Sequence, residues 1–145
     1  MLVMLMPDQV MKYWYLVREG LEETLPPYVT NSPNKMEDIQ MGLLIGKAQC
    51  WLFISEEPTV KCVVITRTIQ DDLTDSAIFE ITSLRSFHKI LGEEWIEGFE
   101  TLRKYATGRG CSKIVFYSDN ELMLKITSKL GFKPTYVYSE YLLGE

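Results

Sequence analysis

The sequence has little histidine and little cysteine, and both shortages exclude kinds of site. His88 is the only histidine, and the three cysteines, Cys50, Cys62 and Cys111, lie far apart with no CxxC pair. An odd cysteine count without such a pair argues against a disulfide framework and against a structural zinc site. We therefore expect three free thiols, buried as small hydrophobic side chains, in a reducing and intracellular setting.

The chain also lacks the motifs of several enzyme classes. It has no P-loop, no GxGxxG and no serine, histidine and aspartate set in a nucleophile elbow. His88 stands beside Lys89, which is typical of a surface loop. The acids Asp71, Asp72 and Asp75 are close together, but a calcium loop needs a longer and more regular spacing of oxygen ligands. We expect no metal site.

Positive charge is too sparse for a broad nucleic-acid surface. Lysine and arginine number 15 against 20 acids, giving a net charge of −5, and no basic stripe with interleaved aromatics is present. The apolar N-terminal stretch MLVMLMPDQ is too short for a membrane span or a signal sequence and has no positive flank. We therefore expect a cytoplasmic protein with no nucleic-acid or membrane partner.

The sequence does contain enough apolar residues to form one hydrophobic core. Its 145 residues are 46% hydrophobic, with no internal repeat and no low-complexity linker. That length is typical of one domain that buries a sizeable core, so we expect a single domain over residues 1–145.

The first third of the chain predicts a strand and two helices. The strand covers residues 2–6, and the first helix starts at Pro7 and stops before Pro26. Its apolar residues recur at helical spacing: Val10, Trp14, Val17 and Leu21. A loop covers residues 28–34, and a second helix runs from about Ser32 to about Gly46.

The middle of the chain predicts a mixed sheet. Strands at residues 49–54 and 60–69 flank a turn and form an antiparallel hairpin, and a third strand covers residues 77–84. A long helix over residues 91–109 precedes a strand at residues 113–117. Because a strand–helix–strand connection is a right-handed crossover, the strands on either side of the long helix should be parallel. The fold class is α/β, with helices on both faces of a mixed sheet.

The segment NELMLKITSKLGF, residues 120–132, predicts a capped helix. Asn120 follows a strand and is a good N-cap, while Gly131 supplies the left-handed residue that ends the helix before Phe132 re-enters the core. The apolar face has four-residue spacing: Leu122, Ile126 and Leu130. A last strand is expected over residues 135–143. Its exposed edge needs protection or a partner, which leaves a homo-oligomer open.

This segment resembles the C-terminal motif of the GNAT N-acyltransferase superfamily, in which an asparagine after a strand, a helix and Lys-Leu-Gly-Phe precede the last strands. Asn120 and KLGF at residues 129–132 match that motif. The order β-α-α-β-β-β-α-β-α-β also fits, so the resemblance covers nearly the whole chain. It implies that the two parallel strands splay apart and admit acetyl-CoA or a related acyl-CoA. The implied acceptor is a small-molecule or protein amine.

The resemblance also implies where the cofactor binds. In this superfamily the pyrophosphate lies on the loop before the long helix, where backbone N–H groups and the helix N-terminus favour anions. The matching candidates for cofactor binding are Leu84, Arg85, His88, Lys89, Gly92 and Asn120. The loop is degenerate, because Gly92 is its only glycine and the acids Glu93 and Glu94 are poor neighbours for a pyrophosphate.

Two residues are candidates for catalysis through the same resemblance. A glutamate on the fourth strand often serves as the base, and Glu80 stands in the middle of AIFEITSL. Alternatively, Glu80 lies on a solvated face or pairs with Arg67 or Lys61 on the neighbouring strand. The usual general acid is a tyrosine at the position that Thr127 occupies here, so the usual group that protonates the thiolate is missing.

Two functions remain open. The first is an N-acyltransferase that moves an acyl group from acyl-CoA to an amine, and it rests on the order of elements and on the C-terminal motif. The second is a GNAT-shaped protein without catalysis that serves binding or assembly, such as phage and prophage genomes carry. It rests on the missing glycines, the two glutamates and Thr127. The second function predicts a filled gap between the parallel strands, and the first predicts an open gap near Leu84 and Tyr117.

Overall fold

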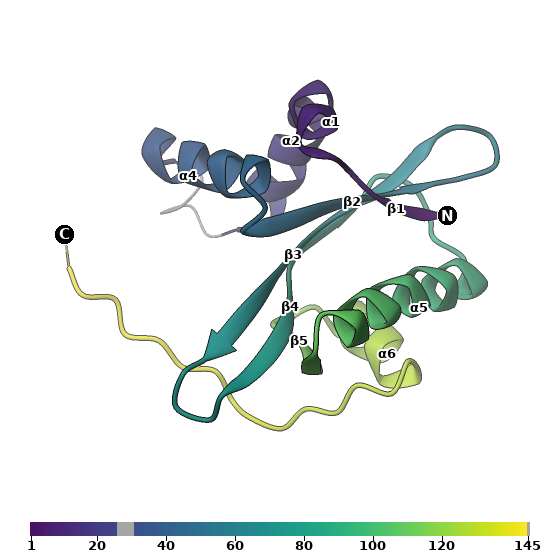
Figure 1. The fold of residues 1–145 in the computed structure, drawn as a ribbon. Helices are drawn as coiled ribbons and strands as arrows, with labels where there is room; N and C mark the ends of the chain where they lie inside the picture. The colour runs from purple at the N-terminus through teal and green to yellow at the C-terminus, as the bar shows by residue number, and fades with distance from the viewer. Residues whose placement is uncertain (26–30, 145) are drawn as a thin grey trace.

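The computed structural model describes residues 1–25 and 31–144 (Figure 1). Its helices are α1 (Pro7–Lys12), α2 (Trp14–Thr24), α4 (Pro33–Leu44), α5 (Gly92–Gly108) and α6 (Glu121–Lys129). Its strands are β1 (Leu2–Met4), β2 (Ala48–Ile54), β3 (Val60–Asp71), β4 (Ser76–Ser86) and β5 (Cys111–Phe116). The predicted helix break at Pro26, and part of the loop predicted over residues 28–34, lie outside the described residues.

The strands form one mixed sheet in the order β1-β2-β3-β4-β5. The pairs β1–β2, β2–β3 and β3–β4 are antiparallel, and the pair β4–β5 is parallel. The predicted hairpin and the predicted parallel crossover through α5 are both confirmed. Helices α1, α2 and α4 cover one face of the sheet, and α5 covers the other (Figure 1).

The sheet divides the core into two apolar clusters. In β2, Cys50 and Leu52 join the cluster beneath α1, α2 and α4, whereas Trp51 and Phe53 join the cluster beneath α5. Successive side chains of a strand point to opposite faces, so a strand buried on both faces has an unbroken apolar run. This explains the run of apolar residues in β2. The Trp51 indole N–H donates to the hydroxyl of Thr66 at 2.9 Å, which satisfies a buried polar group.

All three cysteines are free thiols, as predicted. Cys50 and Cys62 are buried, and burial raises the pKa of each thiol to about 12. Cys111 is only partly buried at the start of β5. The first two thiols therefore stay protonated and unreactive at neutral pH.

The prediction of one helix after Pro7 is wrong at Tyr13. Tyr13 has φ −102° and ψ 12°, and it ends α1 and begins α2. The break has a packing reason, because α1 contacts α4 whereas α2 contacts β3 and β4. Val10 and Val17 are both buried even so, at 1% and 0% exposure. The apolar spacing thus predicted the buried face correctly but not the turn within it.

Helix α6 begins and ends as predicted. The Asn120 side-chain oxygen accepts the N–H of Met123 at 3.1 Å, which is an N-cap bond. At the other end Gly131 has φ +101°, and the N–H of Phe132 returns to the carbonyl of Thr127 at 3.0 Å. This is the glycine-ended helix terminus that satisfies the last carbonyl groups.

The prediction of a last strand over residues 135–143 is wrong. These residues form neither helix nor strand, and the segment extends away from α6 (Figure 1, yellow). The Phe132 ring is still anchored, at 5.4 Å from the Phe99 ring and 5.1 Å from the Phe116 ring. Beyond it, Tyr136 is 88% exposed. The segment has strand propensity, but no neighbouring strand of the same chain pairs with it.

We expect Gly131→Ala to lower the free energy of unfolding by about 1 kcal/mol, because a Cβ is strained at this positive φ. Urea unfolding followed by circular dichroism measures the change. Gly108→Ala is the matched control, since Gly108 ends α5 with open space around it and its φ is not positive. The control should leave stability unchanged or raise it. Equal losses in both variants would contradict the role of the left-handed backbone at Gly131.

Candidate functional site

The parallel strands β4 and β5 separate part-way along β4. Their last paired residues are Ile81 and Phe116, whereas β4 continues along β3 as far as Ser86. Within the described chain, the edge of β4 beyond Ile81 that faces away from β3 has no strand partner. The predicted divergence is confirmed, although the strand includes Arg85, which the sequence had suggested as the start of a loop.

A β-bulge lies at the point of separation. On β3, Ile65 pairs with Ser83 of β4, and the next residue, Thr66, pairs with Ile81. Thr82 is therefore an extra residue with no partner on β3. A bulge bends its strand and increases the local twist. This bulge directly follows the last pair with β5, so it accounts locally for the turn of β4 away from its neighbour.

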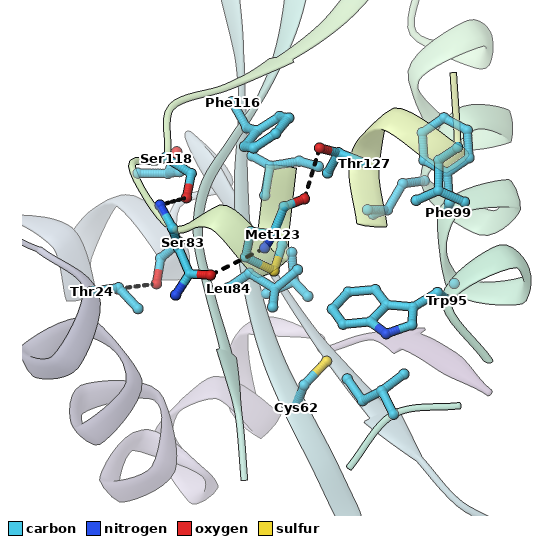
Figure 2. Close-up of a pocket in the computed structure, with 18 of the residues that line it drawn as sticks. Thr24, Cys62, Ser83, Leu84, Trp95, Phe99, Phe116, Ser118, Met123 and Thr127 are labelled. Carbon is cyan, nitrogen blue, oxygen red and sulfur yellow. Dashed lines mark hydrogen bonds between the residues drawn. The ribbon is translucent and has the colours of Figure 1, made fainter. Parts of the chain in front are cut away.

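An open cavity of about 350 Å³ lies where the two strands separate (Figure 2). Its walls come from the sheet, from α5 and α6, from the end of α2 and from the loop between β5 and α6. Apolar side chains dominate the lining, including Leu84, Trp95, Phe99, Phe116 and Met123. This volume is at the lower end for small-molecule sites. The cavity therefore suits a narrow and largely apolar ligand arm.

Three of the residues predicted from the resemblance line this cavity: Leu84, Asn120 and Thr127. The side-chain oxygen of Asn120 is used in the helix cap, which leaves its amide nitrogen as a donor. Thr127 is 8% exposed, and its hydroxyl lies 2.8 Å from the carbonyl oxygen of Met123. Its only hydrogen is thus bound to the helix backbone, so it is poorly placed to protonate a leaving group.

The four other candidates for cofactor binding do not line the cavity: Arg85, His88, Lys89 and Gly92. Arg85 packs closely against α2, where a Cβ on Gly20 would lie 3.2 Å from its own Cβ. Its guanidinium stacks 5.3 Å from the Phe87 ring centre and donates to the Ser86 carbonyl. His88 and Lys89 are exposed. Arg85 is therefore held by the protein rather than turned toward a ligand, and the role of these residues stays a prediction.

The N-terminus of α5, where the resemblance implies a pyrophosphate, already holds an anion. The Glu94 carboxylate accepts the backbone N–H of Leu91 at 2.9 Å and the Lys61 ammonium at 2.8 Å. The bond from Lys61, followed by the bond from Leu91, holds the pKa of Glu94 below its ordinary value of 4.5. An ionised carboxylate thus occupies a backbone donor that a phosphate would use.

Glu80, the candidate base, is buried but does not line the cavity. Its carboxylate accepts the Arg67 guanidinium at 3.0 Å, the pairing that the sequence left open as an alternative. The Thr82 hydroxyl also donates to it, at 3.1 Å. Because Thr82 lines the cavity, its hydroxyl group links Glu80 to the cavity by one hydrogen bond. Its role as a base stays a prediction.

The polar end of the cavity is formed by residues that the sequence did not indicate: Glu23 and Thr24 at the end of α2, and Ser83 of β4. The Thr24 oxygen lies 2.9 Å from the Gly20 carbonyl oxygen and 2.5 Å from the Ser83 oxygen (Figure 2). Since a carbonyl only accepts, Thr24 gives its hydrogen to Gly20 and Ser83 must donate to Thr24. The Ser83 oxygen therefore offers a lone pair to the cavity.

A second hollow has a volume of about 860 Å³. It is lined by Leu21 of α2, Ile39 of α4 and Arg67 of β3, among others, and it shares Thr82 with the cavity.

The described residues offer no other obvious chemistry. Across residues 1–25 and 31–144, no three histidine, cysteine, aspartate or glutamate residues cluster so as to hold a metal ion. Asp71 instead caps a turn, where its carboxylate accepts the N–H of Leu73 at 3.0 Å. In the same part of the chain, no helix has both the length and the apolar composition needed to cross a membrane.

Comparison with known proteins identifies the fold. No family model matches the chain, and no curated protein is similar to it in sequence. A crystal structure of a probable acetyltransferase has a TM-score of 0.74 at 11% identity, covering 100% of this chain and 97% of that one. A ribosomal-protein-alanine N-acetyltransferase from Brucella melitensis biovar Abortus 2308 has a TM-score of 0.69 at 14% identity, covering 100% and 99%. The aminoglycoside N-acetyltransferase AAC(6')-Iy in complex with CoA has a TM-score of 0.74 at 11% identity, covering 99% and 93%.

The chain therefore has the fold of GNAT acetyltransferases, as the resemblance implied. At these identities the similarity establishes the shared architecture: a mixed sheet with helices on both faces. In this chain, the cavity between β4 and β5 lies within that arrangement of sheet and helices.

The lowered pKa of Glu94 predicts a pH-dependent contribution to stability. Ionised Glu94 stabilises the fold above its ordinary pKa of 4.5, and that contribution is lost as the pH falls through the lower pKa of the folded state. Glu94→Gln should therefore be less stable than the parent at pH 7, and the difference should shrink at pH 3.5. Urea unfolding at both pH values measures this. Glu93→Gln, an exposed acid in the same helical turn, should change little at either pH. A Glu94→Gln deficit of equal size at both pH values would contradict this assignment.

Proposed function

We propose that this chain is an acyl-CoA-dependent N-acyltransferase that binds acyl-CoA between β4 and β5 and uses an amine as acceptor. The observation that carries the proposal is the divergence of the two parallel strands around an apolar cavity of about 350 Å³. Solved structures with this fold support it, because they are described as acetyltransferases and one of them contains CoA.

The cavity fits the pantetheine arm of CoA better than its nucleotide end. The arm is narrow, and its amide groups can bond to the open edge of β4 beyond Ile81 as an added strand would. Asn120 lines the same cavity, and its amide group is a further donor for the arm. For the pyrophosphate, Glu94 already uses the N–H of Leu91, so the exposed side chain of Lys89 would supply the positive charge.

An acyl-CoA supplies an activated thioester, whose thiol leaves when an amine attacks the carbonyl carbon. The protein must orient the amine, accept its proton and stabilise the carbonyl oxygen. Backbone N–H groups on the open edge of β4, just beyond the bulge at Thr82, are fixed donors for that oxygen. They need no reorganisation during the reaction, which is what makes such donors effective.

The acceptor amine is oriented by the polar end of the cavity. The Ser83 oxygen accepts an amine N–H, because its own hydrogen is given to Thr24. Glu23 also lines the cavity, and its negative charge attracts a cationic amine. A proton released from the amine passes to the Thr82 oxygen while the Thr82 hydrogen moves to Glu80, along the existing 3.1 Å bond.

The leaving thiolate takes its proton from water. Thr127 stands where the superfamily usually has a tyrosine, and its hydroxyl is bound to the helix carbonyl of Met123. Cavity-lining Tyr117 is 64% exposed at the end of β5, so water has access to this side of the cavity.

A second function, binding or assembly without catalysis, is favoured by one observation. The carboxylate of Glu94 holds the N-terminus of α5, which weakens the site for a pyrophosphate. Against it stands the open cavity, because a protein that had lost its acyl donor would be expected to fill this gap with side chains.

Binding of acetyl-CoA tests the proposal directly. Millimolar acetyl-CoA or CoA should raise Tm and release heat in a calorimeter, since a ligand at 100 times its Kd stabilises by about 2.7 kcal/mol. Ser118→Trp places an indole at the cavity wall and should abolish both signals. Leu73→Trp is the control, because Leu73 is 94% exposed in the turn between β3 and β4. The absence of heat and of a Tm shift with the parent protein would rule out the transferase.

The role of Glu80 is separable from its ion pair with Arg67. With acetyl-CoA and a panel of primary amines, thiol release should fall about 100-fold in Glu80→Gln, while acetyl-CoA binding is unchanged. Arg67→Met breaks the same pair but keeps the carboxylate, so it should retain more than about a tenth of the parent rate. Equal losses in the two variants would mean that Glu80 serves the ion pair alone.

A further inference from the structure

Helix α5 does not pack against the sheet along its whole length. Toward its C-terminus the packing is tight, because Leu102 and Ala106 are only 5% and 3% exposed. Toward its N-terminus, Trp95 and Phe99 are only half-buried, and both line the cavity of about 350 Å³. The cavity therefore extends from the separation of β4 and β5 into the space between α5 and the sheet (Figure 2).

The floor of this extension is a row of side chains that crosses four strands. Leu84 of β4 pairs with Val64 of β3, and Cys62 lies two residues before Val64 on the same face. Cys62 pairs with Phe53 of β2, which in turn pairs with Leu2 of β1. All five residues line the cavity and belong to the apolar cluster beneath α5. Strands lie about 4.8 Å apart, so the row is about 14 Å long. The space above it is called here the side branch.

The chemistry of the side branch favours a hydrocarbon chain. Leu2, Phe53 and Val64 have only apolar side chains, and burial raises the pKa of the Cys62 thiol to about 12, so it stays neutral. The amide groups of a pantetheine arm would lose their hydrogen bonds to water over this floor without replacing them. They can be satisfied instead along the open edge of β4 beyond Ile81. The arm therefore leaves the side branch to another part of the ligand.

A glycine in α5 keeps the side branch open. Gly98 lies in the interior of the helix and lines the cavity, although glycine there is less favourable for a helix than alanine. A Cβ on Gly98 would lie 3.7 Å from Cδ2 of Phe53, which is an ordinary contact distance. A methyl group would thus fit without strain, whereas a longer side chain would enter the side branch.

We propose that the acyl group of the donor is a medium-length hydrocarbon chain, which lies in the side branch, rather than an acetyl group. The inference rests on the proposed function, since it specifies the acyl group of the same donor. An aliphatic carbon takes about as much room as a water molecule, about 30 Å³, so an acetyl group fills only about 60 Å³ and a chain of about six to eight carbons fills about 180–240 Å³. The remainder of the cavity holds the end of the arm. Transfer forms an amide bond to the acceptor amine and releases CoA as the thiol.

Calorimetric titration of the full chain with a series of CoA thioesters tests the inference. The series runs through acetyl-, butyryl-, hexanoyl-, octanoyl-, dodecanoyl- and hexadecanoyl-CoA. Each buried methylene adds to the affinity, so octanoyl-CoA should bind at least about 30-fold more tightly than acetyl-CoA. Hexadecanoyl-CoA is too long for the side branch and should bind no more tightly than octanoyl-CoA. Non-specific adsorption would instead strengthen steadily with chain length.

Gly98→Leu locates the chain. The new side chain occupies the side branch, so the ratio of octanoyl-CoA affinity to acetyl-CoA affinity should fall at least about tenfold. Gly108→Leu is the matched control in the same helix, because a Cβ there meets nothing within 4 Å. It should keep the ratio of the parent. Circular dichroism and Tm show whether each variant is folded, and the chain-length profile of the parent decides the question if Gly98→Leu is not.

The outcomes separate this inference from the proposed function. A parent that binds acetyl-CoA as tightly as octanoyl-CoA would overturn the medium-length chain and leave the acyltransferase standing. A parent that binds no CoA thioester would remove both. Affinity that rises steadily to hexadecanoyl-CoA, or an unchanged ratio in folded Gly98→Leu, would also overturn the assignment to the side branch.

Discussion

One extra residue in β4, Thr82, marks the place where β4 and β5 separate. With Thr82 unpaired on β3, β4 bends just after its last pair with β5, and the two parallel strands separate. The cavity lies at this separation, and Ser83, the residue after Thr82, is within hydrogen-bond distance of Thr24 on α2. Beyond Ile81, one edge of β4 has no strand partner in the described chain. The cavity, its polar end and the open edge of β4 therefore lie together at the bulge.

Electrostatics set a second constraint, which opposes the first. The cavity has room for a ligand arm. The N-terminus of α5, however, is capped by the carboxylate of Glu94, which also forms an ion pair with Lys61. A phosphate that approached this helix would meet a negative charge and an occupied backbone donor. Under the proposed function, the cavity would hold the acyl-carrying arm, whereas the N-terminus of α5 would bind a pyrophosphate only weakly. On this account, binding energy comes mainly from the apolar walls around Leu84 and Trp95.

Local patterns in the sequence predicted what depends on local physics. The cap at Asn120, the left-handed turn at Gly131 and the parallel crossover through α5 follow from capping, backbone and handedness rules. The break at Tyr13 was not predictable from periodicity, because the apolar spacing continues across it. The bulge and the contact between Thr24 and Ser83 arise from packing between distant segments. Their only trace in the sequence was a polar pair, Thr82 and Ser83, in an apolar strand.

The central claim is that an acyl-CoA arm occupies the gap between β4 and β5. An NMR titration of the isotopically labelled protein with CoA tests it most directly, because each backbone amide reports on its own surroundings. The account predicts that the largest shifts fall on amides of residues 82–86 and 117–120, on the two sides of the gap, with little change in β1 and α4. Shifts confined to other surfaces, or none at millimolar CoA, would contradict it.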